Sequence, residues 1–149
     1  MLLHDGLGSV ASWRDFPNLL AAATGCRTIT YSRQGNGKSD RLAEPRRIDY
    51  MHREALDVLP RIMAALSIEY PVLVGHGDGA SIAMIHAGDT RWKIRGLALM
   101  APHVFVEDMT IAGIEAARVA YRTKGLEERL ARYHEYADEA FWNWNNIWL

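Results

Sequence analysis

The sequence predicts an α/β fold built on a mainly parallel sheet of about four strands, with helices on its faces. Short β-branched or apolar runs alternate with amphipathic segments between residues 13 and 100, which is the pattern of right-handed β-α-β crossovers. From about residue 108 onward only helical periodicity remains. We therefore expect a core containing the sheet over residues 1–107 and a helical segment over residues 108–149.

The N-terminal half supplies two strands and two helices. In chain order they are a strand at Met1–Leu3, a helix at Trp13–Ala23, a strand at Arg27–Tyr31 and a helix at about Tyr50–Leu66. Gly25 is expected to end the first helix, because glycine is the common residue just past a helix end. Pro60 is expected to kink the second helix.

The clearest strand–turn–helix unit is Tyr70–Ala87. Its β-branched run stops at Gly75, Gly77 and Gly79, and apolar residues at helical spacing follow. Alternate glycines indicate a tight turn whose backbone is strained or closely approached. Lys93–Met100 is a nearly continuous apolar run, typical of a strand covered on both faces. Helices broken near Gly125 and Ala137 complete the chain.

Composition excludes several classes of protein. A chain of 149 residues that is 49% apolar is expected to form one globular domain. The formal net charge of -1 gives no pull toward nucleic acid or an anionic membrane. Cys26 is alone, so an intrachain disulfide is excluded, and a buried thiol is expected. With no basic leader and no long apolar run, the sequence predicts a cytoplasmic protein.

Two glycine patterns resemble nucleotide-binding motifs and are disfavoured. Ser32–Ser39 ends in Gly-Lys-Ser as a phosphate-binding loop does, but Pro45 interrupts the helix that should begin at the lysine. Gly75-x-Gly77-x-x-Ala80 fits a dinucleotide fingerprint, but the next strand ends in Met-Ala-Pro without the required acidic residue. No cofactor is predicted.

A metal site is a weak alternative at the carboxyl ends of the strands. The residues that follow three of the predicted strands there are His4, His76, His103, Asp5 and Asp78. No H-x-x-x-H spacing supports a metal site, and histidines beside glycine turns more often hold the turn by hydrogen bonds. No metal is therefore predicted, and the three histidines are expected to lie near a substrate.

Three motifs in order give the chain a resemblance to the α/β-hydrolase fold family, particularly to esterases and enol-lactonases. His4–Ser9 resembles the oxyanion loop after the family's third strand, and Tyr31–Asp40 the glycine loop after the fourth. Val74–Gly79 resembles the Gly-His-Ser-Asp-Gly nucleophile elbow after the fifth. The resemblance implies a sheet order of fourth, third, fifth and sixth strand, and makes residues 108–149 similar to the start of a cap domain.

The resemblance also implies roles for the elbow residues, and the sequence departs from them. The nucleophile position is Gly77, which has no hydroxyl, and Asp78 is expected to point away from it. The oxyanion-hole N–H donors would be Asp78 and either Gly6 or Leu7. The family's first two and last two strands have no counterpart, and the only later histidine is His134, in a predicted cap helix. Glu107 or Asp108 falls near an acid position that some members use.

We therefore expect a truncated, catalytically inactive hydrolase scaffold whose ligand, if any, is a small acyl ester or lactone. Alternatives are half of a split hydrolase completed by another chain, a non-catalytic small-molecule binding module, and an enzyme that works through a metal. Unpaired strands at both sheet edges predict a homo-oligomer. The aromatic residues expected to pack on one helical face near the C-terminus are Phe141, Trp142, Trp144 and Trp148.

Overall fold

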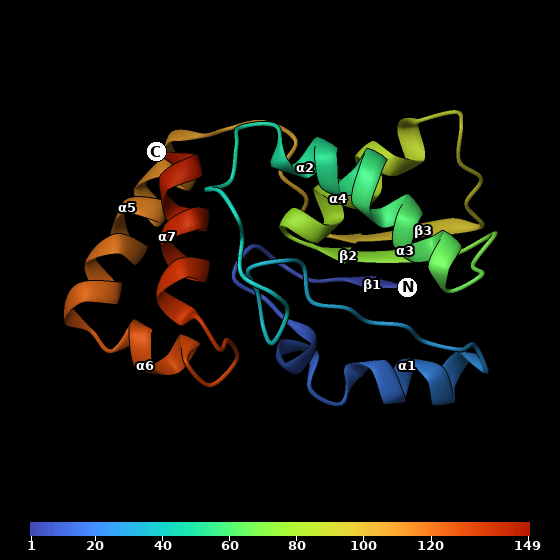
Figure 1. Ribbon diagram of the computed structural model, residues 1–149, viewed down its shortest axis with the longest axis horizontal. Coiled ribbons are helices and arrows are strands. Elements are labelled where there is room, and N and C mark those ends of the chain that lie inside the picture. Colours follow the sequence, from blue (N-terminus) through green and yellow to red (C-terminus); the bar gives the residue numbers. More distant parts are fainter.

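The computed structural model describes all 149 residues and confirms the parallel sheet (Figure 1). Three strands lie in the order β1 (Leu2–Leu3), β2 (Val72–His76) and β3 (Gly96–Met100), and both pairings are parallel. Leu2 is in register with Val74, which is in register with Ala98. The carboxyl ends of all three strands therefore meet at one edge of the sheet.

The strand predicted at Arg27–Tyr31 is reduced to a single bridge. Thr30 pairs in parallel with Leu2, and the Leu2 N–H donates to the Ile29 carbonyl at 2.8 Å. Because β1 has only two residues, its outer neighbour has no room for a longer ladder. The order of this bridge, β1, β2 and β3 is the order that the family resemblance implies.

The first helix begins later than the periodicity predicts. A short 3₁₀ helix, η1 (Val10–Trp13), is followed by Arg14 at φ 50°, and α1 (Phe16–Thr24) starts only after this turn. Gly25 ends α1 in the left-handed conformation at φ 67°, as expected. Cys26 follows and is exposed, so the expectation of a buried thiol is wrong.

The second predicted helix is continuous but changes its winding. It consists of α2 (Tyr50–Arg53), a π-helical stretch η2 (Glu54–Val58) and α3 (Leu59–Ala65). The interruption expected at Pro60 takes the form of this widened stretch just before the proline, which has no N–H to continue the regular ladder.

The main core lies between the sheet and the helices that cover one of its faces. In Figure 1, α2, α3 and α4 (Asp78–Gly88) lie above the sheet and α1 lies below it. The buried residues of this core are Met1, Leu3, Ala55, Leu59, Met63, Leu73, Ile82 and Ala83. Burying each large aliphatic side chain contributes about 1.5–3 kcal/mol. By contrast, α1 buries none of its residues.

The C-terminal residues form three helices beside the carboxyl edge of the sheet (Figure 1). They are α5 (Asp108–Thr123), α6 (Leu126–Leu130) and α7 (Ala137–Trp148), with Gly125 at φ 67° before α6. Tyr121, Leu130 and Phe141 form a second buried cluster, in which the rings of Tyr121 and Phe141 stack at 4.0 Å. None of the helices is both long enough and apolar enough to cross a membrane.

Candidate active site at the nucleophile elbow

The predicted strand–turn–helix unit is present, with Gly77 at the tip of the turn between β2 and α4. Gly77 has φ 53° and ψ -121°, a conformation that side-chain-bearing residues rarely adopt. Its N–H donates to the Met100 carbonyl at 2.9 Å, and its carbonyl accepts from the N–H of Ala80 at 2.9 Å. The turn is thus fixed to β3 on one side and to the first turn of α4 on the other.

The two flanking glycines are required by close backbone contacts. A Cβ on Gly75 would lie 2.5 Å from the Ala80 Cα and would also overlap the Gly79 carbonyl oxygen. A Cβ on Gly79 would overlap the Leu3 carbonyl and lie 2.6 Å from the His4 carbonyl oxygen. Small residues on both sides of position 77 are therefore needed for the turn to approach β1 and α4.

Asp5 occupies the space that a side chain at position 77 would need. A Cβ built on Gly77 would overlap Asp5 Oδ1 and lie 2.8 Å from Asp5 Cγ. Asp5 comes from the loop after β1, far from Gly77 in sequence. The sequence contained no local signal for this contact, which depends on the side-by-side pairing of β1 and β2.

Asp78, the first residue of α4, carries a carboxylate that is almost fully buried. Its side chain is 1% exposed, and Tyr50 donates its hydroxyl to Oδ2 at 2.5 Å. Oδ1 accepts no hydrogen bond and lies 3.5 Å from His103 Nε2. Burial raises the pKa of Asp78, while the nearby Arg33 opposes this rise. Burial and the neighbouring Asp78 carboxylate raise the pKa of Tyr50.

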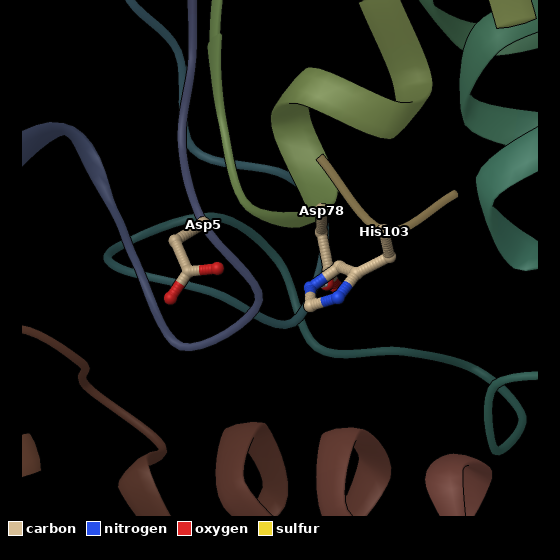
Figure 2. A group of neighbouring side chains, drawn as sticks. All are labelled: Asp5, Asp78 and His103. Atoms are coloured by element: carbon tan, nitrogen blue, oxygen red, sulfur yellow. Dashed lines mark ion pairs between the residues drawn. The ribbon is translucent and has the colours of Figure 1, made fainter. Parts of the chain in front are cut away.

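Figure 2 shows Asp5, Asp78 and His103 together at the carboxyl ends of the three strands. One ligand-type atom from each residue lies within 4.8 Å of the others. The Asp5 carboxylate occupies the place where a side chain at position 77 would project, and an Asp78 carboxylate oxygen lies within 4.8 Å of an Asp5 oxygen. Of the five histidines and aspartates considered in the sequence, the structure gathers these three.

His103 is held in place from two directions. Its backbone N–H donates to Ser81 Oγ at 2.8 Å, and Ser81 Oγ donates to its carbonyl at 3.1 Å. The imidazole packs against the Trp148 ring with centroids 4.8 Å apart. His103 keeps about a third of its side chain exposed, so the ring faces both Asp78 and solvent.

His4 and His76 are not part of this group. The His4 ring accepts the Arg33 backbone N–H on Nε2 at 3.0 Å and donates from Nδ1 to the Asp5 carbonyl at 2.7 Å. Burial, reinforced by the positive charge of Arg33, lowers the pKa of His4 well below its usual range. His4 thus holds the loop by hydrogen bonds, the role that is commonest for such histidines. His76 lies exposed at the end of β2.

The loop predicted to supply oxyanion donors is anchored by buried side chains. Asn36 donates to the Gly6 carbonyl at 3.2 Å. His134 accepts the Gly37 N–H on Nδ1 at 3.0 Å and donates from Nε2 to the Leu7 carbonyl at 3.0 Å. His134 lies in the turn between α6 and α7, so its predicted place in a helix is wrong. Burial lowers its pKa, and both ring nitrogens are used in anchoring the loop.

Some of the C-terminal aromatic residues pack in the second buried cluster, and others lie against the site. Phe141 is fully buried, and Trp142 meets it edge-on at 5.0 Å, which confirms their predicted packing role. Trp144 lies directly over Gly6, where an added Cβ would overlap the indole ring. Trp148 lies against His103. Residues of α7 therefore form one wall beside the elbow.

An open cleft of about 470 Å³ extends from the site. It begins at Ser81 and His103, and its remaining lining is mainly apolar, including Met51, Ile85 and Trp148. A larger cavity of about 590 Å³, between η1, the glycine loop and the α6–α7 turn, contains no elbow residue. A smaller cleft of about 220 Å³, lined in part by Asp5 and His76, reaches the elbow itself. The cleft beside His103 contains no elbow residue and approaches the elbow through His103, which lies 3.5 Å from Asp78.

The remaining sequence candidates lie outside this group. No helix begins at Lys38, and the next helix starts at Tyr50, so the phosphate-binding-loop interpretation is excluded. Glu107 and Asp108 are exposed at the start of α5. No local pattern signalled a cluster behind Asp78 that contains the buried residues Arg33, Glu54 and Tyr50 and the partly buried Arg46. Burial raises the pKa of Glu54 there.

Comparisons with known proteins agree with this architecture. The chain resembles a hydrolase from Pseudomonas aeruginosa PA01 (TM-score 0.60, 20% identity, 82% of this chain and 43% of that chain). It also resembles a carboxylesterase of the thaumarchaeon Nitrososphaera gargenis (TM-score 0.70, 18% identity, 94% and 55%). A third similar structure is a monoacylglycerol lipase of Paleococcus ferrophilus (TM-score 0.60, 19% identity, 98% and 65%).

These solved structures are longer than the chain, which spans roughly half of their length. No curated protein matches the sequence. The sequence profile of the α/β hydrolase fold matches residues 1–133, which is most of the chain and includes the oxyanion loop, the glycine loop and the elbow. The chain therefore belongs to the α/β-hydrolase fold family.

Proposed function

We propose that this chain is a scaffold of the carboxylic-ester or lactone-hydrolase type that performs no serine-based hydrolysis and binds small acyl compounds in the cleft beside His103. The observation that carries the proposal is Gly77 at the tip of an intact elbow. In serine hydrolases this position supplies the hydroxyl that attacks the carbonyl carbon. The other parts of the elbow, its flanking glycines and its N-terminal helix turn, are retained.

The space around Gly77 adds a second obstacle to serine chemistry. The Asp5 carboxylate fills the place where a nucleophile's side chain would project. His134 uses both ring nitrogens to anchor loops, and His4 does the same. The one ring near the elbow with a free approach is His103, and it lies against Asp78 and Trp148.

Binding without turnover is supported by the cleft. Its mainly apolar lining suits the acyl portion of an ester or lactone, and Ser81, His52 and His103 supply polar groups at its edge. Short acyl esters, lactones and carboxylates that bind the native state must raise the melting temperature in a thermal-shift assay.

Gly77→Ser is expected to give no measurable turnover of a p-nitrophenyl ester. The new side chain must displace the Asp5 carboxylate. His4 and His134 use both ring nitrogens in anchoring loops, and His103 lies against Asp78 and Trp148. Steady-state release of p-nitrophenol, compared with the unchanged chain at equal concentration, measures the result.

A matched variant makes this experiment decisive. Gly77→Ser combined with Asp5→Gly removes the carboxylate that obstructs the new hydroxyl, and it too is expected to remain inactive. A gain of a hundredfold or more in either variant, abolished by His103→Ala, would identify His103 as a working base and overturn the proposal.

We also propose that the chain self-associates through an open edge of the sheet. β3 pairs only with β2, and Leu97 and Met100 on it are 38% and 37% exposed. Just beyond it, Val104, Phe105 and Val106 are 62–70% exposed. Unpaired edges with apolar side chains favour pairing with another chain. A split hydrolase completed by a different chain stays an alternative prediction.

Light scattering at micromolar concentration is expected to give at least twice the monomer mass. Leu97→Lys, which places a charge on the edge strand, is expected to shift the population toward monomer. A folded monomer at every concentration for the unchanged chain would contradict self-association.

A further inference from the structure

We propose that Asp5, Asp78 and His103 form a binding site for a divalent transition-metal cation such as Zn²⁺, Mn²⁺ or Co²⁺. The three side chains come from the loops or helix that directly follow β1, β2 and β3 (Figure 2). This proposal is independent of whether the cleft binds esters, because it concerns only the side chains beside Gly77.

The geometry of the three donors is close to that of a metal site. One oxygen or nitrogen atom of each residue lies within 4.8 Å of the others, and His103 Nε2 lies 3.5 Å from Asp78 Oδ1. Ligands about 2.0–2.2 Å from a tetrahedral zinc ion lie roughly 3.3–3.5 Å from one another. The Asp78–His103 pair already has this separation. The Asp5 oxygen lies within 4.8 Å of the other two donor atoms and must move closer to them to complete the set.

An unpartnered buried atom independently indicates a missing ligand. Asp78 Oδ1 accepts no hydrogen bond although its side chain is 1% exposed, and it lies 3.5 Å from Nε2 of His103, another member of the cluster. Leaving such an oxygen unpaired costs about 1–3 kcal/mol. A cation placed between the three residues would satisfy it.

The neighbouring groups orient the donors in the way that metal ligands are usually oriented. Tyr50 donates to the second oxygen of Asp78, which directs Oδ1 toward the cluster. Ser81 fixes the backbone of His103, and Trp148 limits the rotation of its ring. Such outer contacts commonly contribute a factor of 10 to 100 in metal affinity.

The charged groups around Asp5, Asp78 and His103 are compatible with a bound cation. Asp5 and Asp78 contribute two carboxylates, and the positive charge of the nearby Arg33 opposes the rise in the pKa of Asp78. The Arg33 guanidinium donates to the carbonyls of His4 and Asp5 rather than to either carboxylate. The carboxylate oxygens are therefore not consumed by an ion pair with arginine. A ligand set of one imidazole and two carboxylates favours Zn²⁺, Mn²⁺ or Co²⁺ over Ca²⁺ and Mg²⁺, because Ca²⁺ and Mg²⁺ prefer sets made only of oxygen ligands.

Gly77 is part of the same arrangement. Any side chain at this position would collide with the Asp5 carboxylate and move it away from Asp78 and His103. The residue that removes the serine nucleophile is thus also the residue that admits Asp5 to the cluster. Gly77→Ala should therefore weaken metal binding, although the substitution neither adds nor removes a metal ligand.

The experiment uses the full chain after EDTA has removed any bound metal. Zn²⁺ binding is measured by titration calorimetry, and Co²⁺ binding is measured by visible absorption. We expect one cation per chain and a Co²⁺ spectrum of low coordination number. Asp5→Asn, His103→Asn and Gly77→Ala are each expected to weaken binding at least tenfold. The matched controls are Asp40→Asn and Asp57→Asn, which change two exposed aspartates outside the cluster and the cleft.

The controls should bind as the unchanged chain does. Circular dichroism and the melting temperature in EDTA show whether each variant folds, and a rise in melting temperature on adding Zn²⁺ gives a second readout. The absence of saturable binding below about 1 mM, or unchanged affinity in folded Asp5→Asn or His103→Asn protein, would overturn the proposal. If the two control variants lost metal binding as strongly as the cluster variants, the binding would be adventitious surface coordination, and this result would also overturn the proposal.

Discussion

Gly79→Ala is expected to lower the free energy of unfolding by about 3 kcal/mol or more, at or above the upper end of the usual cost of overpacking, because the clash is with backbone. The added Cβ would overlap the Leu3 carbonyl and lie 2.6 Å from the His4 carbonyl oxygen. These atoms belong to β1 and its loop, so no flexible side chain can move aside. Relief of the clash requires β1 to separate from α4, which exposes the core residues Leu3 and Ile82. Urea denaturation followed by circular dichroism measures the change.

Gly113→Ala is the matched control for this prediction. Gly113 lies inside α5, and a Cβ there would meet no atom within 4 Å. Alanine in a helix interior is favoured over glycine by about 0.5–1 kcal/mol, so this variant should be slightly stabilised. Equal effects of the two substitutions would show that the elbow is not packed against β1 as described.

Arg33→Met is expected to destabilise the chain by about 3 kcal/mol, because it removes a buried charge on which several groups depend. The guanidinium donates to the His4 carbonyl at 2.5 Å and to the Asp5 carbonyl at 2.7 Å. Its positive charge also opposes the rise in pKa that burial imposes on Glu54 and Asp78. Methionine fills much of the volume but leaves both carbonyls without their donors.

Arg91→Met is the control on the surface. Arg91 pairs with Asp89 at 2.7 Å, but its side chain is 61% exposed, and such pairs rarely contribute measurably to stability. Chemical denaturation of both variants should therefore show a clear loss for Arg33→Met and an unchanged midpoint for Arg91→Met. A midpoint for Arg33→Met within error of the unchanged chain would contradict the proposed role of the buried cluster.

Local sequence patterns predicted most of the elements and the elbow itself. Alternate glycines at positions 75, 77 and 79 predicted a tight turn. In the structure backbone lies too close for a Cβ at Gly75 and Gly79, and the Asp5 side chain lies too close for one at Gly77. Gly25 ended its helix as predicted. The less accurate predictions concern neighbours rather than local preference. The expectation that β3 is covered on both faces is wrong, because Leu97 and Met100 are exposed on it. The strand at Arg27–Tyr31 shrinks to one bridge because β1 offers only two residues for pairing.

For the aromatic residues near the C-terminus, too, the sequence predicted the local arrangement but not the neighbours. Helical spacing predicted that they share a face, and Phe141 and Trp142 pack as expected. Periodicity cannot say what the face meets, because that depends on the position of α7 relative to the sheet. Only the structure shows Trp144 over Gly6 and Trp148 against His103.

The sequence by itself determined the fold family, the parallel sheet and the absence of a hydroxyl at the nucleophile position. These features follow from local periodicity, glycine spacing and the residue type at position 77. Only the tertiary structure decided that Asp5 fills the place left by that hydroxyl and that it lies beside Asp78 and His103. The physical reason is that strand pairing brings together three loops distant in the chain, and the side-chain directions there depend on packing that no local pattern records.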